Sequence, residues 1–136
     1  MNLEASCDLE PAPGSAAQAL AFLEESLDAA AVPLKQKNRF MVVFDDMYAN
    51  IVNYSGASRA TVSVTRVADR AVITLRDNGS AFDPLAAEDP DITAPVMERN
   101  EGGLGILMMK RMTDEVSYER DQGENVLRMV IFVREA

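Results

Sequence analysis

The most informative stretch of the sequence is DDMYAN at residues 45–50, which sets a carboxylate and an amide one helical turn apart. Two further stretches follow along the chain, DNG at residues 77–79 and GGLG at residues 102–105. The first of these is an acid followed by a turn, and the second is a glycine cluster that opens an expected helix. Each is weak alone. In this order, in a chain of 136 residues, they predict a site for nucleotide phosphates.

Two helices are expected before the first strands, because apolar residues recur at every third or fourth position. The first covers about 15–31, where Leu23 and Leu27 share a face, and Pro33 ends it. The second covers about 34–54 and therefore contains the stretch DDMYAN.

Alternation of apolar and polar residues predicts strands in much of the remaining chain. Two strands follow the second helix, over 60–65 and 71–77, and two more form a hairpin over 115–120 and 126–133. Residues 1–13 alternate only briefly, so an edge strand and a tail both stay open for them.

Residues 79–103 have no period and contain three prolines, which indicates a long loop. Loops of this length in compact domains are usually functional or disordered. A helix over 104–112 follows the loop. The order of elements predicts a single α+β domain spanning 1–136, a two-layer sandwich with helices on one face of a mainly antiparallel mixed sheet.

Composition narrows the classes of partner and of chemistry. The net charge is −9, and both nucleic acids and anionic membranes are bound through Lys and Arg, so neither is expected as a direct partner. With neither a signal peptide nor a membrane-length apolar run, a cytoplasmic protein is expected. The absence of histidine excludes His metal sites, Ser–His catalysis and autophosphorylation on histidine. Cys7 is the single cysteine, so no internal disulfide can form.

A polar stripe runs along the second expected helix. Asp46 and Asn50 lie four residues apart and Asn53 continues three residues further, so the three side chains are expected on one face. An amide oxygen is a hard ligand that suits Mg²⁺, and the carboxylate could orient a water or accept a hydroxyl proton. A solvated face of an amphipathic helix explains the same spacing, and both interpretations stay open.

The end of the second strand carries a carboxylate where an apolar residue is expected. Asp77 shares a face with Ile73 and Leu75, so it needs a donor, and the exocyclic amine of a base is one candidate. Gly79 would allow a close approach or a positive φ. A plain turn at a strand end is the alternative.

The glycine cluster stands where the long loop becomes a helix. Backbone N–H groups of Gly102, Gly103 and Gly105 could hold phosphates there, helped by the helix dipole. Neither the dinucleotide fingerprint nor the P-loop pattern fits the cluster. A flexible hinge is the alternative.

Together these segments resemble the GHKL (Bergerat-fold) ATP-binding family, and most closely its single-domain branch, the anti-sigma factor serine kinases. The resemblance runs from about residue 15 to the end of the chain. It is carried by Asp46-x-x-x-Asn50, by DNGSAFDP at 77–84 and by GGLGI at 102–106, with further likeness in MTDEVSY at 112–118.

The resemblance implies a site for ATP and Mg²⁺. Asn50 would coordinate Mg²⁺ on the phosphates, Asp77 would accept from the adenine amino group, and Gly79 would let the base lie close. Residues 85–101 would form the ATP lid. The other implied nucleotide-binding positions are Asn53, Phe82, Gly102, Gly103, Leu104 and Gly105, of which Gly103 and Gly105 would present backbone donors to the phosphates.

The resemblance also implies a reaction and its partners. A protein-serine kinase would transfer the γ-phosphoryl group of ATP to a STAS-type anti-sigma antagonist, and a kinase homodimer would sequester a sigma factor. The family's catalytic base is a glutamate at the position of Asp46. The shorter side chain withdraws the carboxylate, and a misplacement of about 1 Å can cost around 100-fold in rate. Two alternatives remain, a nucleotide-gated binding module with weak or no kinase activity and an interaction domain that binds no nucleotide.

Overall fold

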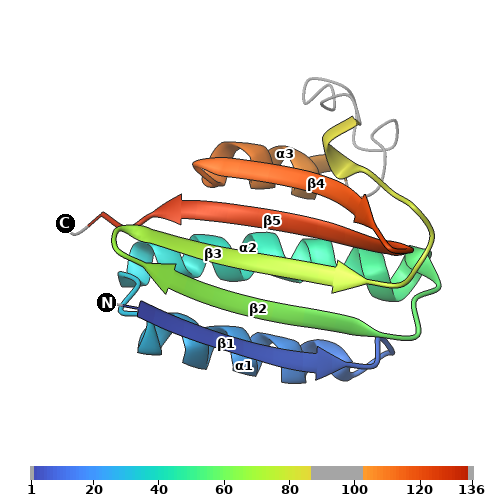
Figure 1. The fold of residues 1–136 in the computed structure, drawn as a ribbon, viewed down its shortest axis with the longest axis horizontal. Helices are drawn as coiled ribbons and strands as arrows, with labels where there is room; N and C mark the ends of the chain where they lie inside the picture. The colour runs from blue at the N-terminus through green and yellow to red at the C-terminus, as the bar shows by residue number, and fades with distance from the viewer. Residues whose placement is uncertain (1, 87–102, 135–136) are drawn as a thin grey trace.

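The computed structural model describes residues 2–86 and 103–134. The described strands form one five-stranded sheet in the spatial order β1-β2-β3-β5-β4, and each neighbouring pair is antiparallel. The α-helices cover one face of this sheet (Figure 1). In chain order the elements are β1 (Asn2–Leu9), α1 (Ser15–Ala29), α2 (Leu34–Asn50), the π-helix η1 (Ile51–Ser55), β2 (Ala60–Val67), β3 (Arg70–Asp77), the 3-10 turn η2 (Pro84–Ala86), α3 (Gly103–Met112), β4 (Glu115–Asp121) and β5 (Glu124–Phe132).

This architecture confirms the predicted α+β sandwich with helices on one face. The sheet was expected to be mixed, whereas the strand pairs of the described residues are antiparallel throughout. No helix in the described part of the chain is both long and apolar enough to cross a membrane.

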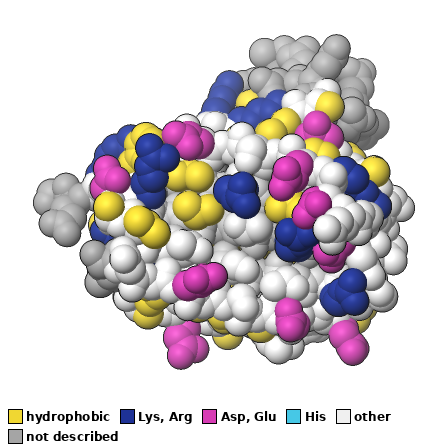
Figure 2. Space-filling view, in the orientation of Figure 1, with side chains coloured by type: hydrophobic (Ala, Val, Ile, Leu, Met, Phe, Trp, Pro, Cys, Tyr) yellow, Lys and Arg dark blue, Asp and Glu magenta, His cyan; other side chains and the backbone are white. Residues whose placement is uncertain are grey.

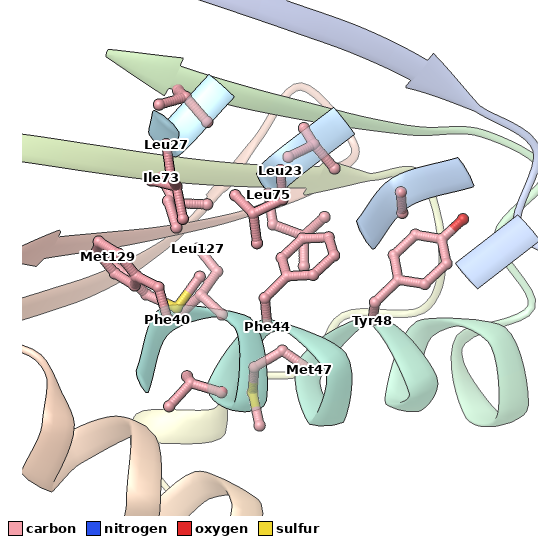
Figure 3. Close-up of a cluster of buried hydrophobic side chains, with 14 of the residues drawn as sticks. Leu23, Leu27, Phe40, Phe44, Met47, Tyr48, Ile73, Leu75, Leu127 and Met129 are labelled. Carbon is pink, nitrogen blue, oxygen red and sulfur yellow. The ribbon is translucent and has the colours of Figure 1, made fainter. Parts of the chain in front are cut away.

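The hydrophobic core lies between the helices and the sheet (Figure 3). Leu23 and Leu27 of α1 and Phe44 of α2 meet Ile73 and Leu75 of β3, and all five are almost completely buried. Burial of one such side chain stabilises the fold by roughly 1.5–3 kcal/mol. The helical and strand periods read from the sequence therefore point at one common core.

The opposite face of the sheet is open to solvent. Figure 2 shows acidic and basic side chains spread over it among small apolar groups. On β3, Val72, Thr74 and Arg76 are only partly buried, in alternation with the fully buried Ile73 and Leu75. The buried functional groups therefore have to be sought on the helix side.

The N-terminal segment is the edge strand that the sequence left undecided. Residues 2–9 pair with β2 along their whole length, from Asn2 opposite Val67 to Leu9 opposite Ala60. The link that follows is fastened to the core, because the Ser15 hydroxyl lies 2.8 Å from the hydroxyl of Tyr48 in α2.

The second helix does not continue as an α-helix to residue 54 as predicted. The regular helix ends at Asn50 and Ile51–Ser55 form a π-turn. The Ser55 hydroxyl donates to the carbonyl of Ile51 at 2.7 Å, and a serine that bonds back one turn competes with the backbone ladder. Gly56, with a φ of 70°, then ends the helical run.

Candidate functional site

A pocket of about 530 Å³ opens between the end of α2 and the part of the sheet formed by β3, β5 and β4. Its lining is largely apolar, with a few polar groups set among the apolar ones, as in small-molecule sites generally. The described residues that line it are Met47, Asn50, Ile51, Tyr54, Ser55, Leu75, Asp77, Ser80, Ala81, Phe82, Pro84, Ile106, Tyr118, Asn125 and Leu127.

Asp77 is the buried carboxylate of this pocket. It is the last residue of β3, and the strand alternation turns it toward the helix layer, where it is only 4 % exposed. Its Oδ1 atom accepts hydrogen bonds from the backbone N–H of Gly79 at 2.9 Å and from Nδ2 of Asn125 at 3.1 Å. Among the described residues both bonds go to one oxygen, so Oδ2 can accept from a donor in the pocket.

Asn125 was not identified from the sequence. It lies directly opposite Asp77 in the pairing of β3 with β5, and it is 6 % exposed. Its Nδ2 also donates to the carbonyl of Ser80 at 2.8 Å. The signal was present in the strand pattern, because the inward positions Leu127 and Met129 extend backwards by two residues to Asn125.

The loop after β3 approaches the π-turn so closely that only glycine fits. A Cβ atom added to Gly79 would lie 2.6 Å from Cβ of Ser55 and 2.7 Å from its carbonyl oxygen. The backbone N–H of Ser80 donates to that same carbonyl at 2.9 Å. Gly79 thus has the close approach that the sequence suggested, and within the described residues the neighbour is Ser55.

The residues of the expected polar stripe on the second helix do not all line the pocket. Asn50 lines the pocket, together with Ile51. Asn53 is exposed and is not among the described lining residues, because the wider π-turn changes the angular spacing after Asn50. Asp46 is not among them either.

Asp46 packs against the first turn of α3. A Cβ atom added to Gly105 would lie 2.9 Å from Cβ of Asp46 and 3.0 Å from its Oδ2. Partial burial raises the pKa of the Asp46 carboxyl, and repulsion from Asp45 raises it further. Gly105 therefore brings the start of α3 close to this carboxylate.

Of the remaining predicted residues, Phe82 lines the pocket with its ring half exposed. Gly103 is the first residue of α3, as the glycine cluster predicted. Gly102, the side chain of Leu104 and residues 87–101 of the predicted lid lie outside the described part of the chain.

Comparison with known proteins gives a family match over most of the chain. A family model described as a histidine kinase-like ATPase domain matches residues 9–131. The serine/threonine-protein kinase BtrW of Bordetella bronchiseptica is 29 % identical over 89 residues, which make up 62 % of this chain and 63 % of that protein. The chain thus spans less than two thirds of this relative.

Solved structures share the fold at low sequence identity. The RsbU and RsbW domains of Rv1364c from Mycobacterium tuberculosis match with a TM-score of 0.70 at 13 % identity, over 98 % of this chain and 34 % of that one. The SiaB–SiaC complex from Pseudomonas aeruginosa matches with a TM-score of 0.66 at 18 % identity, over 93 % of this chain and 88 % of that one. The family model confirms the predicted resemblance at the level of the histidine kinase-like ATPase domain, and the solved structures show that the fold is shared.

Proposed function

Because this chain belongs to the histidine kinase-like ATPase domain family, we propose that it binds ATP with Mg²⁺ and acts as a protein-serine kinase on a STAS-type antagonist protein. The observation that carries the proposal is the buried Asp77 carboxylate in a largely apolar pocket, where both of its hydrogen bonds to described residues go to one oxygen. Such a pocket suits a flat purine whose exocyclic amine meets a fixed acceptor.

The donor set of the pocket fits Mg·ATP. Apolar side chains, including Met47, Ile51 and Leu127, offer contact surface for a base, and Asn50 supplies an amide oxygen of the kind that suits Mg²⁺. The start of α3 at Gly103 and Gly105 supplies backbone N–H groups for phosphate oxygens. When bound, Mg·ATP supplies the transferable γ-phosphoryl group.

Asp46 is our candidate for the catalytic base. As the serine oxygen of the partner bonds to the γ-phosphorus, the bond to the β–γ bridging oxygen breaks and ADP leaves, and the hydroxyl proton passes to Asp46. The raised pKa of this carboxyl makes it a better proton acceptor than an ordinary aspartate. Positioning and charge neutralisation contribute most of the catalysis in such transfers.

A nucleotide-gated binding module is the second candidate, and one observation favours it. Asp46 packs on Gly105 and is not among the described residues that line the pocket. In this case ATP and ADP would set the affinity for a partner without efficient phosphoryl transfer.

The partners belong to the proposal as well. BtrW is named as a serine/threonine kinase, and the SiaB–SiaC structure is that of a complex between two proteins, which supports a kinase that acts by binding another protein. We propose a STAS-type antagonist as the phosphorylated partner, a sigma factor as the sequestered one, and a kinase homodimer as the acting form.

Nucleotide binding is tested by thermal unfolding with millimolar Mg·ATP. A ligand at one hundred times its Kd stabilises a protein by about 2.7 kcal/mol. Wild type should gain stability, and Asn50→Ala should gain less with Mg·ATP while differing little with ATP in EDTA. No gain for wild type at millimolar Mg·ATP would overturn the ATP proposal and leave an interaction domain that binds no nucleotide.

Kinase activity is tested with γ-labelled ATP and a STAS-domain protein recovered by pull-down from the native host. Wild type should label a serine of that protein, and Asp46→Ala should lower the labelling rate by about 100-fold or more while ATP affinity stays within a few-fold. Nucleotide-dependent partner binding without any label would support the binding module instead.

A further inference from the structure

Asn125 is a buried amide that the proposed chemistry has not yet used. It projects from β5 toward the helix layer, between the end of β3 and the loop that follows it. A buried side-chain amide at a pocket is expected to have its hydrogen bonds satisfied, and its partners show which atom points where.

The orientation of the amide is fixed by groups that cannot exchange roles. The backbone N–H of Phe82 can only donate and reaches Oδ1 at 3.2 Å, and the carbonyl of Ser80 can only accept and lies 2.8 Å from Nδ2. Oδ1 also accepts from the Tyr118 hydroxyl at 2.5 Å and from the Arg120 guanidinium at 3.1 Å. Nδ2 must therefore be the atom that faces Asp77.

This arrangement uses both N–H groups of the amide. One goes to the Ser80 carbonyl and the other to Oδ1 of Asp77 at 3.1 Å. Asn125 consequently has no donor left for a ligand. Asn125 therefore affects a ligand indirectly, by holding the Asp77 carboxylate in place.

We propose that Asn125 is a positioning residue that fixes the Asp77 carboxylate with Oδ2 directed at the amino group of an adenine base. The inference rests on the proposed ATP site. Gly79 N–H and Asn125 Nδ2 together hold Oδ1, so the carboxylate is kept from turning and stays a pure acceptor. A base that carries a carbonyl in place of the amine would meet oxygen with oxygen and be rejected.

The first test compares ATP with ITP, whose base has a carbonyl where adenine has the amine. Wild type should bind ATP more tightly, and Asn125→Ala should shrink this preference by about tenfold, the scale of one buried hydrogen bond to a charged group. A residue with a purely structural role would weaken both nucleotides equally. An unchanged ITP-to-ATP ratio of dissociation constants would therefore overturn the inference.

The second test replaces the amide by its charged isostere. In Asn125→Asp two carboxylates meet at the site of the present 3.1 Å contact. The Arg120 guanidinium, which now lies 3.1 Å from Oδ1, offsets part of their repulsion, and the remainder should make one of them keep its proton to a higher pH. The ATP dissociation constant of this variant, divided by that of wild type, should fall as the pH is lowered from about 8.5 to about 5.5. Taking the ratio removes the titration of the nucleotide itself.

A matched control and a nucleotide-free measurement accompany this test. Asn38→Asp adds the same charge at an exposed position of α2 and should give a ratio near one at every pH. Without nucleotide, the melting temperature of Asn125→Asp should rise relative to that of Asn125→Ala as the pH falls. A gap that does not change with pH would contradict the contact.

A missing ATP site and a missing positioning role would give different results. If wild type binds no ATP, the proposed function is overturned and the positioning role falls with it. If wild type binds ATP but the Asn125→Asp ratio stays at one, or does not change with pH, only the positioning role is overturned.

Discussion

Asp46 combines a raised proton affinity with a place beside the first turn of a helix. Partial burial is the larger cause of its raised pKa, and repulsion from the neighbouring Asp45 raises the pKa further. The carboxylate lies against Gly105 at the start of α3. A group whose pKa is higher in the folded state than in the unfolded chain makes the folded state bind protons more tightly. Its ionisation therefore lowers stability as the pH rises through that raised pKa.

Replacing Asp46 by Asn should stabilise the protein slightly at pH 7. The gain should stay within about 0.5 kcal/mol, because the carboxylate is mostly exposed and solvent screens it. At about pH 4 the gain should be smaller, since the folded wild-type carboxyl binds a proton more readily than the unfolded one and part of the cost of its charge is removed. Urea unfolding at both pH values measures the difference.

The control for this change is Asp69→Asn, which removes a charge from an exposed position in the turn between β2 and β3. It should show no comparable pH dependence. A loss of stability for Asp46→Asn that is larger at pH 7 than at pH 4 would mean that the carboxylate has a stabilising partner. Ionisation of Asp46 would then raise the stability of the fold and not lower it.

Single-residue predictions from the sequence reached Asp77 and missed its partner. An aspartate on an apolar strand face stands out by itself, because a carboxylate there has to be satisfied. Asn125 shares the inward face of Leu127 and Met129, but its contact with Asp77 becomes visible only once β3 and β5 are paired in register, since the two residues are 48 positions apart and directly opposite. The alternation along a strand shows which residues share a face, but it does not by itself show which residue of a distant strand lies opposite.

At the scale of elements, the pocket depends on how closely α3 approaches α2. Gly105 makes the approach possible, since any side chain there would meet Asp46 within 3.1 Å. The clashing atoms include Cβ of Asp46, which cannot swing away as the end of a long side chain can. A larger residue would move one helix relative to the other.

Gly105→Ala should therefore destabilise the fold by about 1–3 kcal/mol, the usual scale for overpacking. It should also weaken Mg·ATP binding, because Ile106, the next residue of α3, lines the pocket. Thermal unfolding and nucleotide titration of the same preparation give the two quantities.

Gly14→Ala is the matched comparison for this variant. Gly14 has a φ of 95° with nothing near its missing side chain, so alanine there adds backbone strain of about 1 kcal/mol without steric contact. It should lose stability and keep its nucleotide affinity. Equal nucleotide affinities for the two variants would argue against a role of the helix approach in the pocket.

Elements with a strong period were predictable, and those governed by local hydrogen bonds were not. The second helix was expected to run on to residue 54 because its apolar spacing continues through Ile51. The π-turn arises from the Ser55 hydroxyl and from contacts of the Ser55 carbonyl with the following loop, which periodicity does not report. The N-terminal strand stayed undecided because its alternating pattern is short. Its pairing with β2 along the whole length makes it a strand, and the sequence pattern does not show that pairing.

At the scale of the whole molecule, the end of the sheet away from the pocket is closed by side chains from three segments. Gln36 of α2 donates to the carbonyl of Phe132 at 2.8 Å and accepts from the backbone N–H of Arg134 at 3.0 Å. Asp114, just before β4, accepts from the backbone N–H of Phe132 at 2.7 Å and from the Arg134 guanidinium at 2.8 Å. The C-terminal end of β5 is thereby tied to both layers.

The Asp114 carboxyl makes this closure sensitive to acid. Burial by itself would raise its pKa, but the hydrogen bonds from Arg134 and from the N–H of Phe132 outweigh burial and lower it. A group whose folded pKa is depressed contributes stability that is present above its unfolded pKa, near 4, and is lost as the pH falls through the folded value.

Asp114→Asn should consequently lower stability by about 1 kcal/mol at pH 7, because the ion pair with the exposed Arg134 is screened and one backbone bond is weakened. The deficit relative to wild type should begin to shrink below about pH 4 and should vanish only below the lowered folded pKa, where wild type has lost the same contribution. Urea midpoints at a series of pH values measure this convergence, with Asp69→Asn as the control for removal of one negative charge.

Since the closure lies at the far end of the sheet from Asp77, Mg·ATP affinity should stay unchanged. A deficit of equal size at pH 7 and pH 3.5 would show that Asp114 acts through packing and not through its charge.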